Sequence, residues 1–372
     1  MKVLHILYKL MPSGAEKMLA DAADLFKNNG IEGCILANDN EYGPFANVLK
    51  AKGYRLFRIP WMQNRMHLID FWKLCRKERF DVVHIHVIRG YVGFALAAKL
   101  AGVKTVVKTF HGIFYPKDRL RLIWHVCQRR VATILGVKFH AISLSVQENE
   151  WRRYRNKTKL IWNWVDESKF PMVNEYDGFR KRGELGINHD AFVLISVGNC
   201  HSESHMRIKN HRLILEALAR LPDTVQNKCV YLHVGSEMAD TPERRLAEEL
   251  GVENITRFLG SRQDVHELLC AANLFVMSSL QEGLGNSVIE ALMSGRNSLL
   301  VNVPGLSDFG KVIPGVRYCE PNALSMTNAI VNACEDDCTL EGKDFLRDAA
   351  IKNFSCETGV RNLLSLYGVR VV

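Results

Sequence analysis

The chain alternates between two kinds of segment, and this alternation limits its fold more than any other feature of the sequence. Short apolar runs rich in branched residues, typical of buried strands, are each followed by a stretch with helical periodicity. The pattern stops over a polar stretch at residues 167–190 and then starts again. It predicts parallel sheets covered by helices on both faces. The expected strands are Val3–Leu10, Gly33–Ala37, Val82–His86, Thr105–Thr109, Phe139–Ser143, Phe192–Gly198, Cys229–Gly235, Ile255–Leu259, Leu274–Ser278 and Ser298–Asn302.

Length and composition agree with a folded protein of two domains. At 372 residues the chain exceeds what one hydrophobic core usually organises. Hydrophobic residues make up 47% and charged residues 24%, values that exclude disordered and collagen-like chains. No apolar run approaches the roughly 18 residues of a membrane-spanning helix, and the first residues lack the cleavage site of an export signal. Ten cysteines form no CxxC pair, so we expect reduced thiols and a cytoplasmic location.

Positive charge is concentrated in the first half of the chain. Within a net charge of +9, residues 1–170 hold an excess of 15 basic side chains and residues 171–372 a deficit of 6. Aromatic residues such as Trp124 and Trp151 lie close to the basic clusters in sequence. Because no nucleic-acid-binding motif accompanies the charge, we expect an anionic membrane surface as partner and no nucleic acid; an ordinary solvated surface is the alternative. The clusters are Lys117, Arg119, Arg121, Arg129 and Arg130, and Arg152, Arg153, Arg155, Lys157 and Lys159.

The most informative motif is SSLQEGLGNSVIEALMSG, directly after a predicted strand. Its glycines make a turn, and Asn286 or Ser287 is placed to cap the helix that follows. Free N–H groups at the start of that helix predict a diphosphate site. Glu282 and Glu290 lie about 10 Å or more apart by helical rise, too far to flank one scissile bond, so we expect them to hold opposite ends of a nucleotide-sugar. The alternative is a solvent-facing Glu290 and a Glu282 that only stabilises the turn.

The run from FLGSRQDVHELL to EALMSG resembles the nucleotide-binding half of the retaining GT-B glycosyltransferases of family 4 (glycosyl transferases group 1), which include sucrose synthases and bacterial capsule and lipopolysaccharide transferases. The pieces SGAEKML, DVVHIH, KTFHG, HAIS and IWNWVD extend the resemblance over nearly the whole chain. It implies an α/β architecture of GT-B type, with two Rossmann-like, doubly wound parallel-sheet domains that face a central cleft. An acceptor-binding domain is expected at residues 1–170, a nucleotide-sugar-binding domain at 171–349, and a C-terminal helix returning to the first domain at 350–372.

The resemblance also implies roles for single residues. Glu290 would accept both ribose hydroxyls, and Glu282 would accept hydroxyls of the donor sugar. Lys209 would neutralise the departing diphosphate, Gly14 would let backbone approach it, and His111 would lie near the reacting end of the sugar. His84 and His86 are expected in the core or behind the site. The predicted catalytic residues are His111, Glu282 and Lys209, and the predicted nucleotide-sugar-binding residues are Gly14, Asn199, Arg207, Lys209, Phe258, Leu259, Gly260, Glu282, Gly283, Leu284, Gly285, Asn286, Ser287 and Glu290.

Three positions depart from the family pattern. Asn199 stands where arginine is usual, and Arg207 in the longer loop either replaces that charge or lies in solvent. Trp164 stands where glycine is common, which suggests an altered domain junction. Pro304 and Gly305 stand where a pair of glycines is frequent, and nothing in the sequence explains this change.

No cofactor and no metal are expected. The sequence contains no Asp-x-Asp, the pattern that would hold a magnesium ion on the diphosphate. His201 and His205 have the spacing of zinc ligands but no third ligand near them in sequence. The resemblance implies front-face attack on the anomeric carbon, with the leaving phosphate taking the proton of the acceptor.

We therefore expect a retaining, metal-independent hexosyltransferase. It would move a sugar from a nucleotide-sugar, UDP-linked rather than GDP-linked, to a lipid-linked glycan in bacterial surface polysaccharide biosynthesis, at the inner face of the cell membrane. Two alternatives remain open: a nucleotide-sugar 2-epimerase of the same architecture, and a non-catalytic protein that binds an anionic polymer.

Overall fold

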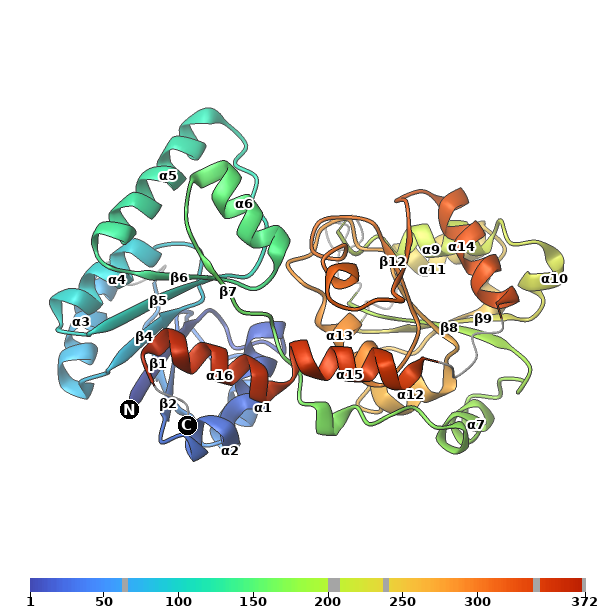
Figure 1. Ribbon diagram of the computed structural model, residues 1–372, viewed down its shortest axis with the longest axis horizontal. Coiled ribbons are helices and arrows are strands. Elements are labelled where there is room, and N and C mark those ends of the chain that lie inside the picture. Colours follow the sequence, from blue (N-terminus) through green and yellow to red (C-terminus); the bar gives the residue numbers. More distant parts are fainter. Residues whose placement is uncertain (62–65, 200–207, 237–240, 337–341, 370–372) are drawn as a thin grey trace. The chain divides into compact units, whose positions relative to one another are not determined.

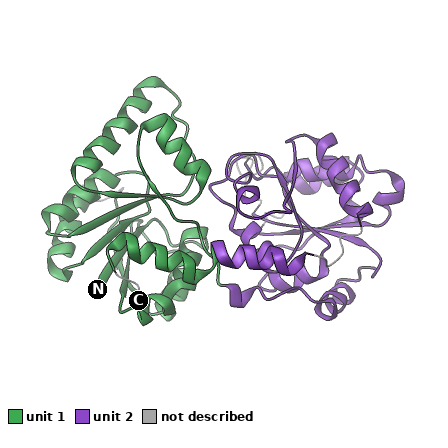
Figure 2. Ribbon diagram, in the orientation of Figure 1, with its two compact units in different colours: residues 1–166, 354–372 green, residues 167–353 purple. Residues whose placement is uncertain are grey.

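The protein folds into two compact units. The computed structural model describes residues 1–61, 66–199, 208–236, 241–336 and 342–369 (Figure 1). Unit 1 consists of residues 1–166 and 354–372, and unit 2 of residues 167–353 (Figure 2). The sequence-based divisions were 170/171 and 349/350. In the described part of the chain, no helix has both the length and the apolar character needed to cross a membrane.

Unit 1 is built on a seven-stranded parallel sheet with the order β3-β2-β1-β4-β5-β6-β7. The direction of strand succession reverses between β1 and β4, which makes their carboxyl ends a switch point, the usual ligand position in such sheets. Helices α3 to α6 pack one beside the next, while α1 lies against α2 and α16. The strands are β1 (Lys2–Leu7), β2 (Glu32–Ala37), β3 (Arg55–Arg58), β4 (Val82–Ile85), β5 (Thr105–Phe110), β6 (Lys138–Ala141) and β7 (Lys159–Leu160), and the helices are α1 (Gly14–Asn28), α2 (Ala46–Ala51), α3 (His67–Glu78), α4 (Tyr91–Leu100), α5 (Arg119–Ile134), α6 (Leu144–Tyr154) and α16 (Cys356–Tyr367).

The last helix, α16, is part of the core of unit 1. Trp164 is buried beside it, and the indole N–H donates to the carbonyl of Met18 at 2.9 Å. A Cβ atom at residue 359 would lie 2.3 Å from the Trp164 ring, so only glycine fits there. Trp164, one of the departures from the family pattern, thus packs directly against Gly359 on α16 in the core of unit 1.

Unit 2 contains a six-stranded parallel sheet with the order β10-β9-β8-β11-β12-β13, which reverses between β8 and β11. The two sheets confirm the predicted α/β architecture with two Rossmann-like units. Strands β3, β7 and β13 were not predicted. The strands of unit 2 are β8 (Phe192–Val197), β9 (Cys229–Val234), β10 (Thr256–Phe258), β11 (Leu274–Met277), β12 (Ser298–Val301) and β13 (Arg317–Cys319), and its helices are α7 (Glu175–Glu184), α9 (His211–Leu218), α10 (Asp223–Gln226), α11 (Pro242–Glu249), α12 (Val265–Ala271), α13 (Asn286–Met293), α14 (Ala323–Glu335) and α15 (Lys343–Phe354).

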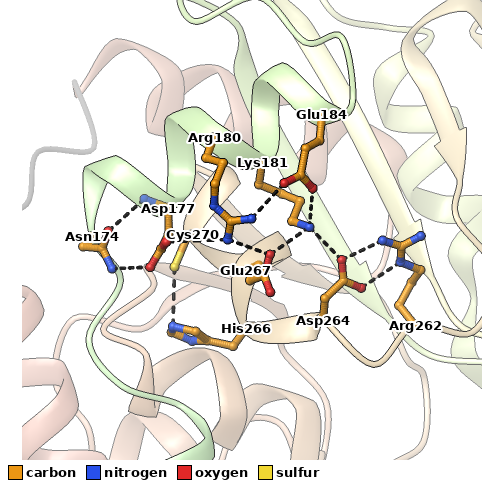
Figure 3. A network of polar contacts seen from close by, with 10 residues as sticks. All are labelled: Asn174, Asp177, Arg180, Lys181, Glu184, Arg262, Asp264, His266, Glu267 and Cys270. Carbon is orange, nitrogen blue, oxygen red and sulfur yellow. Dashed lines mark hydrogen bonds and ion pairs between the residues drawn. The ribbon is translucent and has the colours of Figure 1, made fainter.

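Helix α7 is attached to α12 through charged groups rather than through an apolar face (Figure 3). The Lys181 ammonium is buried and meets three carboxylates, at 2.6 Å from Glu184, 2.8 Å from Glu267 and 2.9 Å from Asp264. Burial alone would lower the pKa of Lys181, but hydrogen bonds to the three carboxylates outweigh it and raise the pKa. The hydrogen bond from Arg262, opposed by burial and assisted by Lys181, holds the pKa of Asp264 well below its usual range.

Candidate functional site

Two of the predicted donor-binding segments of unit 2 lie at its switch point. β8 ends at Val197 and β11 at Met277, and the segments that follow these neighbouring strands carry Lys209 and Glu282. The segments are also joined by backbone contacts. The Leu280 N–H donates to the carbonyl of Ile208 at 2.8 Å. The fold therefore brings two parts of the sequence more than seventy residues apart to the same edge of the sheet.

Lys209 and Glu282 form an ion pair at this edge. The Lys209 Nζ lies 2.6 Å from Glu282 Oε1, and the two side chains are 26% and 13% exposed. The Ser278 hydroxyl holds the Lys209 carbonyl at 3.1 Å and so fixes the lysine backbone. The sequence predicted separate contacts for these two residues, and the structure shows that their side chains pair with each other. A ligand that meets Lys209 therefore also meets Glu282.

The turn after Glu282 leads into α13. Gly285 is the N-cap of this helix, with φ +39°, and a Cβ atom there would lie 3.2 Å from the Met277 sulfur and from Val288. No side chain caps α13. The prediction that Asn286 or Ser287 caps the helix is therefore wrong: both residues are already helical, because the glycine takes the left-handed conformation that ends the turn. The first backbone bond of α13 runs from the Val288 N–H to the carbonyl of Gly285 at 3.0 Å.

Gly305 is the glycine that remains of the usual pair, and its backbone conformation shows why a glycine is needed there; nothing in the structure explains Pro304. The φ of Gly305 is +93°, and a Cβ atom there would lie 2.4 Å from the carbonyl oxygen of Glu282. Glycine at 305 therefore lets the segment after β12 pass directly behind Glu282. The sequence offered only the glycine itself as a signal. Leu284, predicted as a main-chain contact, is buried.

Glu290 lies in the second turn of α13 and is half-buried. Its carbonyl accepts from the Ser294 N–H at 3.1 Å, as expected within a helix. Glu290 is therefore neither fully buried nor fully exposed. Its contact with ribose remains a prediction.

The predicted border of the nucleotide base is held by backbone bonds. The Leu259 N–H donates to the carbonyl of His233, and the Gly260 carbonyl accepts from Gly235, both at 2.9 Å. Main-chain contacts to a base must therefore use other groups, such as the Leu259 carbonyl. The Phe258 ring has the Arg244 guanidinium 4.7 Å from its centroid. Arg244 was not predicted, because it lies on α11, outside every quoted motif.

Asn199 stands where the family usually has arginine. Its Oδ1 accepts from the backbone N–H of Ser236 at 3.0 Å and from the Ser236 hydroxyl at 3.1 Å. The turns after β8 and β9 are also close together, since a Cβ atom at residue 235 would lie 2.0 Å from the Gly198 carbonyl oxygen. Asn199 thus joins two turns. Arg207, the candidate to replace the missing arginine, lies outside the described residues, as do His201 and His205.

Unit 1 contributes the other predicted residues. Gly14 is the first residue of α1, and the hydroxyl of the N-cap Ser13 donates to Glu16. Burial raises the pKa of Glu16, with the hydrogen bond from Ser13 opposing it. The motif SGAE therefore ends in a buried, hydrogen-bonded carboxyl group at the start of α1, after the turn that follows β1.

His111 directly follows β5 and is half-buried. Its Nε2 lies 2.9 Å from Nδ1 of His86. Burial, assisted by the nearby Lys108, lowers the pKa of His111 to about 3, so the imidazole is neutral at physiological pH. His111 therefore offers a neutral ring nitrogen to a ligand and not a positive charge. His84 is fully buried in the core behind it, as predicted.

Two family descriptions match the chain: "Glycosyl transferase 4-like domain" over residues 13–140 and "Glycosyl transferases group 1" over residues 178–333. The chain belongs to the group 1 glycosyltransferases. A relative from Escherichia coli, the UDP-Gal:alpha-D-GlcNAc-diphosphoundecaprenol alpha-1,3-galactosyltransferase, is 25% identical and covers 98% of this chain and 96% of its own. The lipopolysaccharide glucosyltransferase WaaG of E. coli is 32% identical over 40% of this chain and 39% of its own.

Solved structures share the GT-B fold of this glycosyltransferase. A Rickettsia africae glycosyltransferase has a TM-score of 0.82 at 18% identity and covers 98% of this chain and 97% of its own. HepE of Anabaena, in complex with UDP and glucose, has a TM-score of 0.80 at 20% identity, with 99% and 100% covered. Gly14 and His111 fall in the first matched region of the glycosyltransferase, and Lys209, Glu282 and Glu290 fall in the second.

Proposed function

We propose that this glycosyltransferase moves a hexose from a UDP-sugar to a lipid-diphosphate-linked glycan in the synthesis of a bacterial surface polysaccharide, with retention of the anomeric configuration. The E. coli relative, which matches nearly the whole chain, uses UDP-Gal and a diphosphoundecaprenol-linked acceptor. The observation that carries the proposal is the Lys209–Glu282 pair at the switch point of unit 2, one turn before the start of α13.

The proposed chemistry follows from where charge develops. As the bond between the anomeric carbon and the diphosphate breaks, negative charge grows on the phosphate oxygens. Lys209 and the first N–H groups of α13 would stabilise that charge. Glu282, already beside Lys209, would accept from sugar hydroxyls. In this proposal no metal ion is required, because the cation and the helix start supply the positive charge, and the departing phosphate takes the proton of the acceptor.

The binding prediction concerns Glu290. We expect Glu290→Gln to weaken the binding of UDP about 10-fold, because hydrogen bonds from the ribose hydroxyls to a carboxylate are stronger than those to a neutral amide. Thermal shift with UDP, GDP and their sugars measures this, since a ligand that binds only the folded state stabilises it by RT ln(1 + [L]/Kd) and so raises the melting temperature.

Glu335→Gln on α14 is the matched control, because this glutamate is exposed and far along the chain from every predicted site residue. It should leave the affinity unchanged. Equal affinity of wild type and Glu290→Gln for both nucleotides would contradict the placement of ribose at Glu290. A changed sugar nucleotide after incubation without acceptor would indicate epimerisation instead of transfer.

We further propose that α5 of unit 1 lies against the membrane that holds the acceptor. Exposed apolar side chains at 3- and 4-residue spacing form one stripe along this helix, and they include Leu120 (80% exposed), Trp124 (63%) and Ile134 (84%). Exposed basic side chains, Arg119, Arg121 and Arg130, border the stripe. An apolar stripe with basic edges is typical of helices that lie in the membrane interface.

One member of the basic clusters has another role. The sequence grouped Arg129 with the surface charges, and this grouping is wrong: Arg129 is 5% exposed and its guanidinium lies 2.6 Å from a carboxylate oxygen of Glu150. The ring of Tyr154 lies 3.7 Å from the guanidinium carbon. Arg129 therefore fastens α5 to α6 and leaves the opposite face of α5 exposed.

Binding to vesicles tests the surface. Vesicles with anionic lipid should bind the protein, and the variant with Leu120→Ser and Trp124→Ser should bind about 10-fold more weakly. Binding should also weaken as the Debye length falls from about 10 Å at 0.1 M salt to about 3 Å at 1 M. Leu324→Ser on α14 of unit 2, which changes a leucine that is 65% exposed, is the control and should bind like wild type. Equal binding of all three proteins, or binding unaffected by salt, would contradict the proposal.

A further inference from the structure

Five histidines lie at or near the carboxyl ends of neighbouring strands in unit 1, and all are neutral at physiological pH. Burial lowers the pKa of His5 and His111 to about 3 and that of His140 to about 4, and it lowers the pKa of His84 and His86 as well. In the described part of the chain, none of their hydrogen bonds goes to a carboxylate. A neutral imidazole carries one N–H and one acceptor nitrogen, so each bond between these rings fixes which nitrogen holds the proton.

Along the chain of hydrogen bonds that runs from the Ile161 carbonyl to the Tyr367 hydroxyl, donors and acceptors can be assigned in only one way. His140 Nε2 lies 2.7 Å from the carbonyl of Ile161, which can only accept, so His140 carries its proton on Nε2. Its Nδ1 then accepts from the Thr109 hydroxyl at 2.9 Å, and that hydroxyl accepts from His84 Nε2 at 2.5 Å. His84 Nδ1 is left to accept from the Tyr367 hydroxyl at 2.6 Å. His84 and His140 are therefore both Nε2–H tautomers, fixed from one end by a backbone carbonyl.

The second chain ends on His111. His5 Nδ1 lies 3.1 Å from His86 Nε2, and His86 Nδ1 lies 2.9 Å from His111 Nε2. Each contact needs one donor and one acceptor. The three rings must therefore all carry the proton on Nδ1, or all carry it on Nε2. In the residues the structure describes, neither end of this chain meets a carbonyl or a hydroxyl, so both arrangements keep the same two hydrogen bonds.

A metal ion is the competing interpretation of this cluster. Ligating nitrogens of His5, His84 and His86 lie within 4.8 Å of one another. Both nitrogens of His84 and both of His86 are already used in the bonds described above. A metal ion would have to break at least two of these bonds. The buried side-chain nitrogen of Lys108 also lies close by, and it donates to the carbonyls of Thr109 at 2.5 Å and of His86 at 3.3 Å. The hydrogen-bonded arrangement accounts for these rings better.

We propose that His5 and His86 are positioning residues that hold His111 in a tautomer matched to its ligand. The three rings change tautomer together, and the oxygen that meets His111 Nδ1 determines which of the two tautomers all three adopt. This inference rests on the proposed function and on the family resemblance, which implies that His111 lies near the reacting end of the donor sugar; that oxygen would then belong to the sugar. An accepting oxygen selects three Nδ1–H rings, and a donating hydroxyl selects three Nε2–H rings. A reversal takes up one proton at one end of the chain and releases one at the other, so the net charge does not change.

Nitrogen-15 NMR of histidine-labelled protein tests the tautomers without any substrate. Two-bond and three-bond correlations distinguish Nδ1–H, Nε2–H and charged rings, and single histidine variants assign the signals. We expect His84 and His140 as Nε2–H, and His5, His86 and His111 all in one form at pH 7. Different tautomers within the group of three, or a charged ring among them, would overturn the inference. A failure to transfer sugar from any UDP-sugar would instead contradict the proposed function and leave this measurement standing.

Variants at His5 test its consequence for transfer. His5→Leu should lower kcat of sugar transfer about 3- to 10-fold and leave UDP affinity unchanged. His5→Asn, whose amide group can occupy the place of Nδ1, should restore at least half of the activity. Tyr367→Phe removes the first donor of the other chain and is the control: it should lower the melting temperature but change neither kcat nor the tautomer of His111. An equal loss of activity in His5→Leu and His5→Asn would overturn the positioning role.

Discussion

Lys209→Ala should slow sugar transfer by about 10²- to 10³-fold, mainly through kcat. The reason is that the diphosphate gains charge as the glycosidic bond breaks, and a cation placed there stabilises the transition state more than the bound substrate. The side chain is 26% exposed, so its loss should leave the melting temperature within a few degrees of wild type. Steady-state rates with UDP-sugar and a lipid-diphosphate acceptor provide the measurement, and UDP affinity provides the comparison for ground-state binding.

Because Lys209 is paired with Glu282, the loss of activity in Lys209→Ala could have a second cause. Lys209 could matter only because it holds Glu282, and a double-mutant cycle separates the two roles. In a Glu282→Gln background the pair is already gone. Lys209→Ala should still cost at least 10-fold there if the ammonium acts on the diphosphate, whereas no further loss would show that it only positions Glu282. Arg317→Ala is the control, because Arg317 forms an exposed ion pair with Asp336 at 2.7 Å and should leave transfer unchanged.

The apolar runs between helical stretches predicted the sheets well, because most strands are buried on both faces. All six residues of β8 have little exposure, and the prediction of Phe192–Gly198 differs from the observed strand by a single residue at its end. The edge strand β3 was missed, since its sequence RLFR places two exposed arginines in four residues. Hydropathy cannot mark a strand that has charged side chains facing water and little buried area of its own.

Residue spacing identified the groups of the site but not their contacts. The glutamates and the glycine turn lie within one motif, so one sequence window contains them. Contacts such as that of Gly305 with the Glu282 backbone, or of Arg244 with Phe258, join separate loops. The capping prediction for α13 failed for a local reason, since side-chain type suggested Asn286 while the backbone conformation of Gly285 decided where the helix starts.

Helix α7 shows why a polar segment can be essential to a core. The polar sequence EYDGFRKRGELG lies in the stretch where the strand-and-helix pattern stops, so no element of the core was predicted there. In the structure the buried positions of α7 are Gly178, Lys181 and Arg182. The Arg182 guanidinium donates to the Ala271 carbonyl at 2.8 Å and to the side chain of Asn273 at 2.6 Å, so charge replaces apolar contact on this face.

Lys181→Met should destabilise unit 2 by about 2 to 3 kcal/mol, because it leaves three carboxylates facing one another without the cation that joins them. Removal of one partner from a buried pair usually costs about 3 to 5 kcal/mol. The cost is smaller here because the carboxylates are 20% to 46% exposed and partly screened by solvent. Urea unfolding followed by far-UV circular dichroism measures this. Tryptophan fluorescence would not report on unit 2, since all six tryptophans lie in unit 1.

Acid should reduce the difference in the free energy of unfolding between the wild type and Lys181→Met. Hydrogen bonds from Arg262 and Lys181 lower the pKa of Asp264 in the folded state, and the hydrogen bond from Lys181 does the same for Glu184 and Glu267. Groups with a depressed pKa stabilise the fold above the ordinary carboxyl range and lose that contribution as pH falls through their folded values. The free energies of unfolding of the wild type and Lys181→Met should therefore converge as the pH falls below about 4. Arg180→Met removes an exposed member of the same network and should destabilise the protein much less than Lys181→Met at neutral pH. An equal loss of stability in both variants would show that the burial of Lys181 is not what makes it important.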